Sequence, residues 1–552
     1  MRTLILSMAL AAVAVIGATL LAYRSQGPPP DFIWTGGTEI ATLDPGIMTA
    51  LNDGRVAGAL FEGLLVLDAD TLEPRAGVAW RWEVSPDSLT YTFDLRPEAR
   101  WSNGRPVTAG DFVWSWRRVL TPATASEYAY MLYPIRGAKA YYEAVAAADK
   151  AARAGTTGAD APPPPDWSTV GIRTDGSHRL VVTLERPCAY FLDLVAFHTY
   201  MPVPREAVEA YKERWTLPPH IISNGAYRLD SWTFRSRMVW EKNPYYWNAR
   251  NVALGRIEVR VYEQSNTALL AYETGVVDLT TEVPALSVQP LLAAERSGRR
   301  SDVLFAPRLG TYFYRFNCTF GPLKDERVRR ALALAIERRL IIDRAARGNQ
   351  EPAHAFVPPN MRGYVPPEGV PEDVQQARRL LAEAGYPGGE GLPELAILVN
   401  RGADHVPLAQ VVQEQWRKNL GIRVRIEQVE WKVFLDMMKG LQYQIARAGW
   451  FGDYLDPNTF MDMFVTGGDQ NQTGWSNAGY DALIAAAANE ADQARRLDLF
   501  RQAERILLRE VPIVPIYYYT SAFLVRPGLE GVVPSRLNRI DFDRLRWANP
   551  KP

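Results

Sequence analysis

The last third of the chain alternates short apolar strands with amphipathic helices. A strand is predicted over 311–316. A helix follows from Asp325, with one apolar stripe made by Val328, Ala331, Leu332, Ala335 and Ile336. Further segments repeat the pattern: a helix over 374–384 closed by Gly385, a strand over 395–399, a helix from about 406 to 420, and a strand over 422–426. This rhythm predicts an α/β unit with a mainly parallel sheet.

The segment 446–454 ends this series and carries unusual chemistry. Tyr443 and Ile445 fall on one face of a predicted strand, the chain is then predicted to turn at Gly449 and Gly452, which bracket Trp450, and Asp453 supplies a carboxylate. Ligands of such sheets bind beyond the carboxyl ends of strands. A strand edge, an aromatic side chain and an anion together suit an extended peptide with a free amino terminus. The alternative is a buried strand that ends in an ordinary turn.

Length and charge limit the class of protein. A chain of 552 residues is too long for a single hydrophobic core and predicts three or four domain-sized units. Lys plus Arg and Asp plus Glu both number 62, so the formal net charge is zero. A nucleic-acid-binding protein normally has a basic excess. We therefore expect no nucleic-acid partner.

The N-terminus resembles an export signal. Met1 and Arg2 precede an uncharged run of 19 residues from Leu4 to Ala22, which favours cleavage after Ala22. The run is also long enough to span a bilayer, so an uncleaved anchor is the alternative. Residues 24–30 then form a short, proline-rich tether. We expect the folded protein in the periplasm, either free or tethered to the cytoplasmic membrane.

Motifs for catalysis and metal binding are missing from the sequence. The five histidines form no His-x-x-x-His, and there is no Cys-x-x-Cys, phosphate-binding loop or Gly-x-Ser-x-Gly elbow. We therefore predict no enzyme, no cofactor and no metal, although a catalytic triad built from distant residues leaves no spacing signal. Cys188 and Cys318 could pair in an exported protein or stay free as small buried hydrophobes.

Many separate stretches carry a resemblance to a known family. They include Leu43-Asp-Pro45, Leu60 to Leu65, Tyr91 to Arg96, Trp101 to Trp116, Ser223 to Leu229, Asn243 to Asn248, Arg327 to Leu332, Leu380 to Tyr386 and Ala446 to Trp450. In this order and spacing, from about residue 35 to 545, the chain resembles the periplasmic oligopeptide-binding proteins of ABC importers. These belong to the peptide/nickel family, family 5, of extracellular solute-binding proteins.

The resemblance implies a fold and a division of the chain. The fold would be α/β: a two-lobed periplasmic binding protein (type II-like, cluster C) with an extra structural domain and mixed sheets. The implied segments are 1–30 (signal or anchor plus tether), 31–61, 204–308 and 519–552 (lobe I), 62–203 (extra domain, with a proline-rich insertion near 143–166), and 309–518 (lobe II).

The resemblance also implies roles for individual residues. Asp453 would bind the α-ammonium of a peptide, and Tyr128 and Trp450 would be cleft aromatics. Backbone pairing with the peptide would come from Gly449 to Phe451 on one edge and from Thr49 to Leu51 on the other. Arg447 and His405 would meet the terminal carboxylate for particular peptide lengths. Structural alternatives are a helix cap for His405, a pairing within the core for Arg447 and packing for Trp450.

Three family features are absent from this sequence. The positions at which close family members form a disulfide are occupied by Gly310 and Phe451, and no cysteine follows the signal for lipid attachment. The family's pocket acid aligns with Thr49, so ligand preference there would differ.

The implied function is capture of short peptides in a closing cleft and their delivery to an ABC transporter permease, by a monomer. The sequence leaves alternatives open. One is a non-peptide solute such as a sugar oligomer, a metal chelate or haem. Another is a membrane-anchored enzyme or adaptor that acts on peptides.

Overall fold

The computed structural model describes residues 28–155, 165–359, 361–401 and 405–549. The predicted signal or anchor and the centre of the proline-rich insertion lie outside these residues. No helix within the described ranges is long and apolar enough to cross a membrane.

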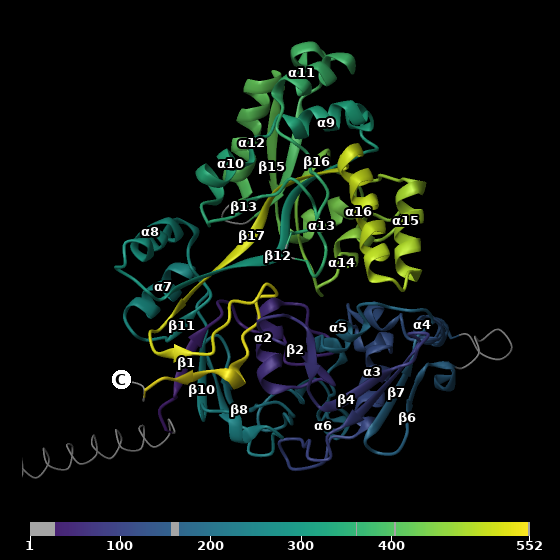
Figure 1. Ribbon diagram of the computed structural model, residues 1–552, viewed down its shortest axis with the longest axis vertical. Helices are drawn as coiled ribbons and strands as arrows, with labels where there is room; N and C mark the ends of the chain where they lie inside the picture. The colour runs from purple at the N-terminus through teal and green to yellow at the C-terminus, as the bar shows by residue number, and fades with distance from the viewer. Residues whose placement is uncertain (1–27, 156–164, 360, 402–404, 550–552) are drawn as a thin grey trace, which may run out of the picture.

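A long mixed sheet runs through the molecule (Figure 1). Its strands, in spatial order, are β15 (Val424–Val429), β14 (Leu395–Asn400), β16 (Ile445–Phe451), β12 (Val303–Phe316), β17 (Ile513–Val525), β11 (Leu279–Thr280), β1 (Phe32–Thr35), β10 (Arg256–Arg260), β9 (Arg237–Lys242) and β8 (Tyr227–Thr233). The short strand β13 (Glu351–Pro352) also pairs with β17. The α/β class with mixed sheets, predicted from the resemblance, is thereby confirmed.

The prediction of a mainly parallel sheet is wrong, because β12 and β17 pair antiparallel along most of their lengths. β12 is also antiparallel to β16. Among the strands that the structure describes, the parallel pairs are β14 with β15 and β16, and β1 with β10 and β11. The strand predicted over 311–316 is only the second half of β12. The two long strands connect the upper and lower parts of the molecule in Figure 1.

The upper part comprises β13 to β16 and the helices around them. These are α9 (Glu326–Leu334), α10 (Arg338–Ile341), α11 (Val374–Glu383), α12 (His405–Leu420), α13 (Trp431–Lys439), α14 (Asn458–Met461), α15 (Ala478–Asn489) and α16 (Gln493–Glu510). Sequence signals explain several helix ends. Asp325 caps α9 through the Arg327 amide, and Gly385 follows α11 with a φ of 94°. The predicted apolar stripe of α9 is buried in the core of this part.

The lower part contains the remaining helices and a second sheet. The helices are α2 (Leu51–Leu60), α3 (Ala109–Val119), α4 (Ala138–Arg153), α5 (Phe191–Val195), α6 (Arg205–Tyr211), α7 (Ser265–Glu273) and α8 (Ala285–Arg296). The second sheet has the order β4 (Ala79–Val84), β5 (Thr90–Leu95), β7 (Arg179–Thr183), β6 (Ile172–Thr174). Short pairs join β2 (Leu65–Leu67) to β3 (Pro74–Ala76), and β18 (Leu529–Glu530) to β19 (Arg546–Trp547). Tyr91, Phe93 and Leu95 of β5 are buried at alternate positions, as their spacing predicts.

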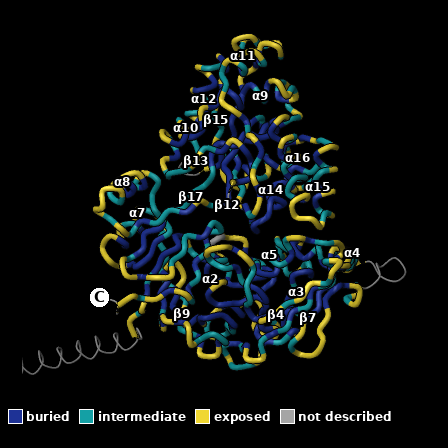
Figure 2. Tube along the Cα trace, in the orientation of Figure 1, coloured by how far each residue is buried: buried dark blue, intermediate teal, exposed yellow. Residues whose placement is uncertain are grey.

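Side chains from the two parts meet opposite the long strands. Arg362 forms ion pairs with Glu73 at 2.7 Å and with Asp193 at 3.2 Å. Tyr190 stacks on Tyr454 with ring centres 4.6 Å apart. Figure 2 shows a buried interior in each part. The lower and upper parts therefore have their own cores and are joined by the long strands and by a limited set of polar and aromatic contacts.

Candidate ligand-binding site

A cavity of about 800 Å³ lies between the upper and lower parts. Six of the predicted site residues line it: Thr49, Tyr128, Gly449, Trp450, Phe451 and Asp453. Arg447 and His405 are not among its lining residues. Leu51 is the first residue of α2, directly after the lining residues Thr49 and Ala50, and its side chain lies outside the described atoms. The structure thus brings most of the predicted site to one place.

One edge of β16 is free beside this cavity. β16 pairs with β12 along its whole length, from Ile445 to Phe451, but with β14 only at Ile445 and Ala446. No described strand pairs with the other edge of β16 beyond Ala446. An extended ligand can add to such an edge through main-chain hydrogen bonds.

Asp453 sits at the end of this edge without a cationic partner. Its Oδ1 accepts a hydrogen bond from the Tyr128 hydroxyl at 3.3 Å, and its amide donates to Thr459 Oγ1 at 3.2 Å. It forms no ion pair with any residue that the structure describes. Burial raises the pKa of Asp453 to about 7, against the lowering effect of the Tyr128 hydroxyl. Burial, and next to it the negative charge of Asp453, raises the pKa of Tyr128 well above its ordinary range.

The glycines near Asp453 serve close packing. A Cβ on Gly449 would lie 2.7 Å from the Tyr519 hydroxyl, and one on Gly452 would lie 2.7 Å from Leu309 Cδ2. The predicted turn at Gly449 is wrong, because β16 continues through Phe451 and the chain leaves the sheet only at Gly452. Close contacts with neighbouring side chains therefore account for both glycines in the free protein.

Trp450 and Phe451, the two aromatic residues of β16, differ in their contacts and in their exposure. The Trp450 indole N–H donates to the Thr459 carbonyl at 2.6 Å, so its polar edge is already satisfied, and the residue lines the cavity. Phe451 is 38% exposed and lies against Tyr519, with ring centres 4.5 Å apart. Phe451 is the more accessible surface for an apolar ligand group.

Arg447 and His405 do not line the cavity, and they are near enough for the Arg447 charge to act on His405. Arg447 Nε donates to Asn400 Oδ1 at 2.6 Å, and its guanidinium lies 5.6 Å from the Trp431 ring centre. His405 stacks on Tyr312, and burial together with the Arg447 charge lowers its pKa to about 4. A neutral imidazole offers a hydrogen bond but no charge to a carboxylate. Arg447 has no ion-pair partner among the described residues.

Several cavity residues carry no local sequence signal. Arg55 in α2, Arg308 in β12, and Phe197 and His198 all line the cavity. His198 is half-buried, with its Nε2 3.0 Å from the Met48 carbonyl oxygen, and desolvation lowers its pKa to about 4. These residues come from segments that are far apart in sequence, and only the tertiary fold brings them together.

The cysteines and the acidic groups show no metal-binding arrangement. Cys188 is buried and Cys318 is half-buried, and both are free. No group of three His, Cys, Asp or Glu side chains in the described ranges could hold a metal ion. Gly310 and Phe451, which replace the family's disulfide positions, are opposite each other in the β12–β16 register.

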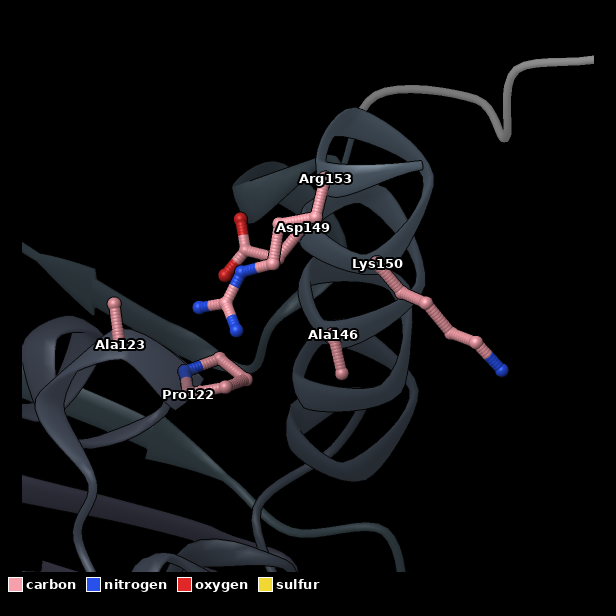
Figure 3. A pocket seen from close by; sticks show the side chains of 6 residues that line it. All are labelled: Pro122, Ala123, Ala146, Asp149, Lys150 and Arg153. Atoms are coloured by element: carbon pink, nitrogen blue, oxygen red, sulfur yellow. The ribbon is translucent and has the colours of Figure 1, made fainter. Parts of the chain in front are cut away.

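A second hollow of about 330 Å³ lies on the surface beside α4 (Figure 3). Its six lining residues are all at least partly exposed, and Lys150 points away from Pro122. It offers no enclosed polar group comparable to Asp453.

Comparisons with known proteins agree with this architecture. The family described as bacterial extracellular solute-binding proteins, family 5 Middle, matches residues 73–472. The periplasmic oligopeptide-binding protein OppA of Salmonella typhimurium is 34% identical over 96% of this chain and 94% of its own length. The probable deoxycholate-binding periplasmic protein YgiS of Escherichia coli is 32% identical over 94% of each chain.

Solved structures give the same result for the fold. The crystal structure of Haemophilus influenzae OppA in complex with the peptide RPPGFSPFR has a TM-score of 0.76 and 29% identity, and the match covers 94% of this chain and 99% of that chain. The family match spans well over half of the sequence, and the relatives align from end to end. The chain is therefore a member of family 5 of the bacterial extracellular solute-binding proteins.

Proposed function

We propose that this protein is an extracytoplasmic solute-binding protein that captures short peptides between its two parts and delivers them to an ABC transporter permease. Family membership supports a solute-binding role without catalysis. The relatives named as oligopeptide-binding proteins, and the related structure with a bound peptide, support a peptide as the solute.

The observation that carries the proposal is the Asp453 carboxylate, which faces the cavity without a cation of its own. An ionised carboxylate in a buried site is costly unless a charge partner and hydrogen bonds compensate for lost water. The α-ammonium of a peptide supplies both. The free edge of β16 begins at the same point, so a peptide whose amino end binds Asp453 can pair its backbone with 449–451.

We assign the remaining predicted residues as follows. Tyr128 positions the Asp453 carboxylate, and Trp450 and Phe451 form an aromatic wall. Thr49 and the start of α2 face the peptide's second edge. Arg447 provides the charge for a terminal carboxylate of a peptide that extends beyond the described cavity, and His405 assists it as a neutral hydrogen-bonding group.

We further propose that residues 31–61, 204–308 and 519–552 form lobe I, that 309–518 form lobe II, and that 62–203 form the extra domain. β12 and β17 cross between the lobes and are suited to act as the hinge. The contacts Tyr128–Asp453 and Arg362–Asp193 then act as closure contacts. We place the protein in the periplasm as a monomer, with the N-terminal segment as signal or tether.

Ligand identification tests this function. The full chain, unfolded and refolded to remove endogenous ligand, is mixed with a random pool of free-amine peptides of two to eight residues, and retained species are identified by mass spectrometry. We expect retention of short peptides without strict sequence preference. A refolded protein with a native circular dichroism spectrum that retains no peptide would contradict the proposal.

A second candidate ligand is an amphipathic, amine-free solute, because a relative of similar identity is named as probably deoxycholate-binding. Deoxycholate binding by calorimetry distinguishes the two. A solute without an amine gains nothing from Asp453, so its affinity would be insensitive to Asp453→Asn.

A further inference from the structure

Arg308 projects from an irregular part of the strand that joins the two parts of the molecule. In β12, Pro307 pairs with Thr520 and Thr311 with Tyr518, so the segment 308–310 bulges out of the β17 ladder. Bulges redirect side chains and are frequent beside binding sites. Here the bulge accompanies the placement of Arg308 in the wall of the ligand cavity.

The Arg308 guanidinium forms no ion pair within the part of the chain that the structure describes. It lies over the Phe451 ring, 4.0 Å from the ring centre, and forms no hydrogen bond or ion pair with any described residue. Burial lowers the pKa of Arg308 to about 10, and Tyr519 and Glu282 oppose this from a greater distance, so Arg308 is a cation at neutral pH. Arg55 in the same cavity differs, since it donates to the Asn538 carbonyl at 2.9 Å and to Asn52 Oδ1 at 3.0 Å.

Arg308 in β12 and Asp453, two residues after the end of β16, lie on facing segments of backbone but do not form an ion pair. The Gly452 amide donates to the Leu309 carbonyl at 2.8 Å, and Arg308 and Asp453 are the next residues beyond this hydrogen bond. Backbones in antiparallel pairs are about 5 Å apart. A carboxylate and a guanidinium therefore enter one cavity from facing backbone positions, and neither forms an ion pair within the described part of the chain.

We propose that Arg308 is a specificity-determining residue that binds a carboxylate carried within the first two residues of the ligand, close to the ammonium held by Asp453. This proposal rests on the proposed peptide-binding function. A peptide advances by only about 3.3 Å per residue, so a more distant carboxylate would miss the guanidinium. The carboxylate can come from an acidic side chain at the first or second residue, or from the carboxyl terminus of a dipeptide.

Matched peptide pairs test this proposal by isothermal titration calorimetry on the stripped full chain. The pairs are Glu-Ala-Ala against Gln-Ala-Ala, Ala-Glu-Ala against Ala-Gln-Ala, and Ala-Ala against its carboxyl-terminal amide. All six compounds keep the free amine. The readout is the affinity ratio within each pair, and the pair with the largest ratio identifies the source of the carboxylate.

We expect the carboxylate member of at least one pair to bind roughly tenfold or more tightly to the wild-type protein, as for a charge-assisted hydrogen bond. In Arg308→Gln this ratio falls towards one, and Arg308→Lys retains part of it. The control is Arg417→Gln, which removes an exposed arginine of α12 that pairs with Glu414 at 2.7 Å, and it leaves the ratio unchanged.

A ratio near one in all three pairs for the wild-type protein would overturn the proposal, whether or not Arg308→Gln folds. An unchanged ratio in a folded Arg308→Gln variant would overturn it too, and would leave Arg308 as a packing partner of Phe451. Failure of the proposed function looks different, because then none of the six peptides binds to the wild-type protein.

Discussion

Asp453 and Asp456 are three residues apart, but only the Asp456 carboxylate has a cationic partner among the described residues. Asp456 receives two hydrogen bonds from Arg496, at 2.6 and 2.8 Å, and both side chains are buried. Asp453 receives one hydrogen bond at 3.3 Å from Tyr128 and has no described cationic partner. The first carboxylate is compensated within the fold, and the second is not.

The difference separates structural charges from binding charges. Arg496 belongs to α16, so its pair with Asp456 fixes that helix to the segment after β16 and satisfies both charges within the upper part. Asp453 faces a cavity that solvent or a ligand can enter. A compensated buried pair stabilises the fold only if it stays complete, whereas an uncompensated charge gains free energy when a ligand brings the missing ion.

The largest expected effect comes from breaking the compensated pair. Arg496→Ala leaves the Asp456 carboxylate buried and unpaired, so we expect the free energy of unfolding to fall by about 3–5 kcal/mol. Denaturant-induced unfolding measures this, and Arg417→Ala on the exposed surface of α12 is the control, with no measurable change expected. A loss below about 1 kcal/mol for Arg496→Ala would contradict the structural role.

Asp453→Asn should affect binding and spare stability. Without the carboxylate, the peptide ammonium has no counter-ion, and we expect a loss of about 2–5 kcal/mol in binding free energy. Because the wild-type carboxylate is uncompensated, the free energy of unfolding at pH 8 should stay equal or rise. Calorimetry and chemical unfolding measure the two quantities, with Asp498→Asn on the outer face of α16 as the control. A destabilised variant with unchanged affinity would reverse the assignment of the two aspartates.

The pH dependence should distinguish Asp453 as well. Its pKa of about 7 in the folded protein lies above the ordinary value of 3.8. The folded protein therefore holds the Asp453 proton more tightly than the unfolded chain does, and the free protein loses stability as the pH rises from about 4 through 7. Peptide binding has the opposite sign, because the ammonium requires the ionised form. Affinity should fall about tenfold per pH unit below 7, with proton release on binding near pH 6.

Asp462 is the group most easily confused with Asp453 in this titration. Burial, followed by the charges of Asp453 and Asp456, raises its pKa to about 7. Calorimetry of Asp453→Asn in buffers of different ionisation enthalpy separates the two. Proton release that persists in this variant would assign the titration to Asp462.

The smallest expected effect belongs to Tyr128→Phe. This change removes the single hydrogen bond to Asp453 and keeps the ring, so affinity at pH 8 should fall by only about 0.5–1.5 kcal/mol. The pKa of Asp453 should rise further, because the hydroxyl stabilises its ionised form. The pH midpoint of binding, measured by calorimetry, should therefore move upward. A midpoint that moves downward would show that the hydroxyl does not stabilise the carboxylate.

Local patterns predicted the elements whose cause is local. Examples are the apolar stripe of α9, the Asp325 cap and Gly385 after α11. The first half of β12 was not predicted, because Pro307 and the bulge interrupt its pattern and its partner β17 lies some 200 residues later in the chain. The prediction of a mainly parallel sheet was wrong because it did not include the antiparallel pairing of β12 with this distant strand.

In the candidate site, too, features with a local cause were predictable and features that depend on distant residues were not. Asp453 was singled out by its position after a strand and by the family resemblance, and the structure places it in the cavity. Its contrast with Asp456 was not predictable, since Arg496 is 40 residues away and nothing in its helix marks it as a partner. The neutral state of His405 likewise depends on burial and on Arg447, which only the tertiary structure brings near.

The most direct test of the central claim is a double-mutant cycle between Asp453 and the peptide's amino group. Calorimetry at pH 8 compares a free-amine tripeptide with its N-acetylated form on the wild-type protein and on Asp453→Asn. If the ligand supplies the missing cation, acetylation weakens binding to the wild type by about 2–5 kcal/mol and has little effect on Asp453→Asn. An equal effect of acetylation on both proteins, or none on the wild type, would contradict it.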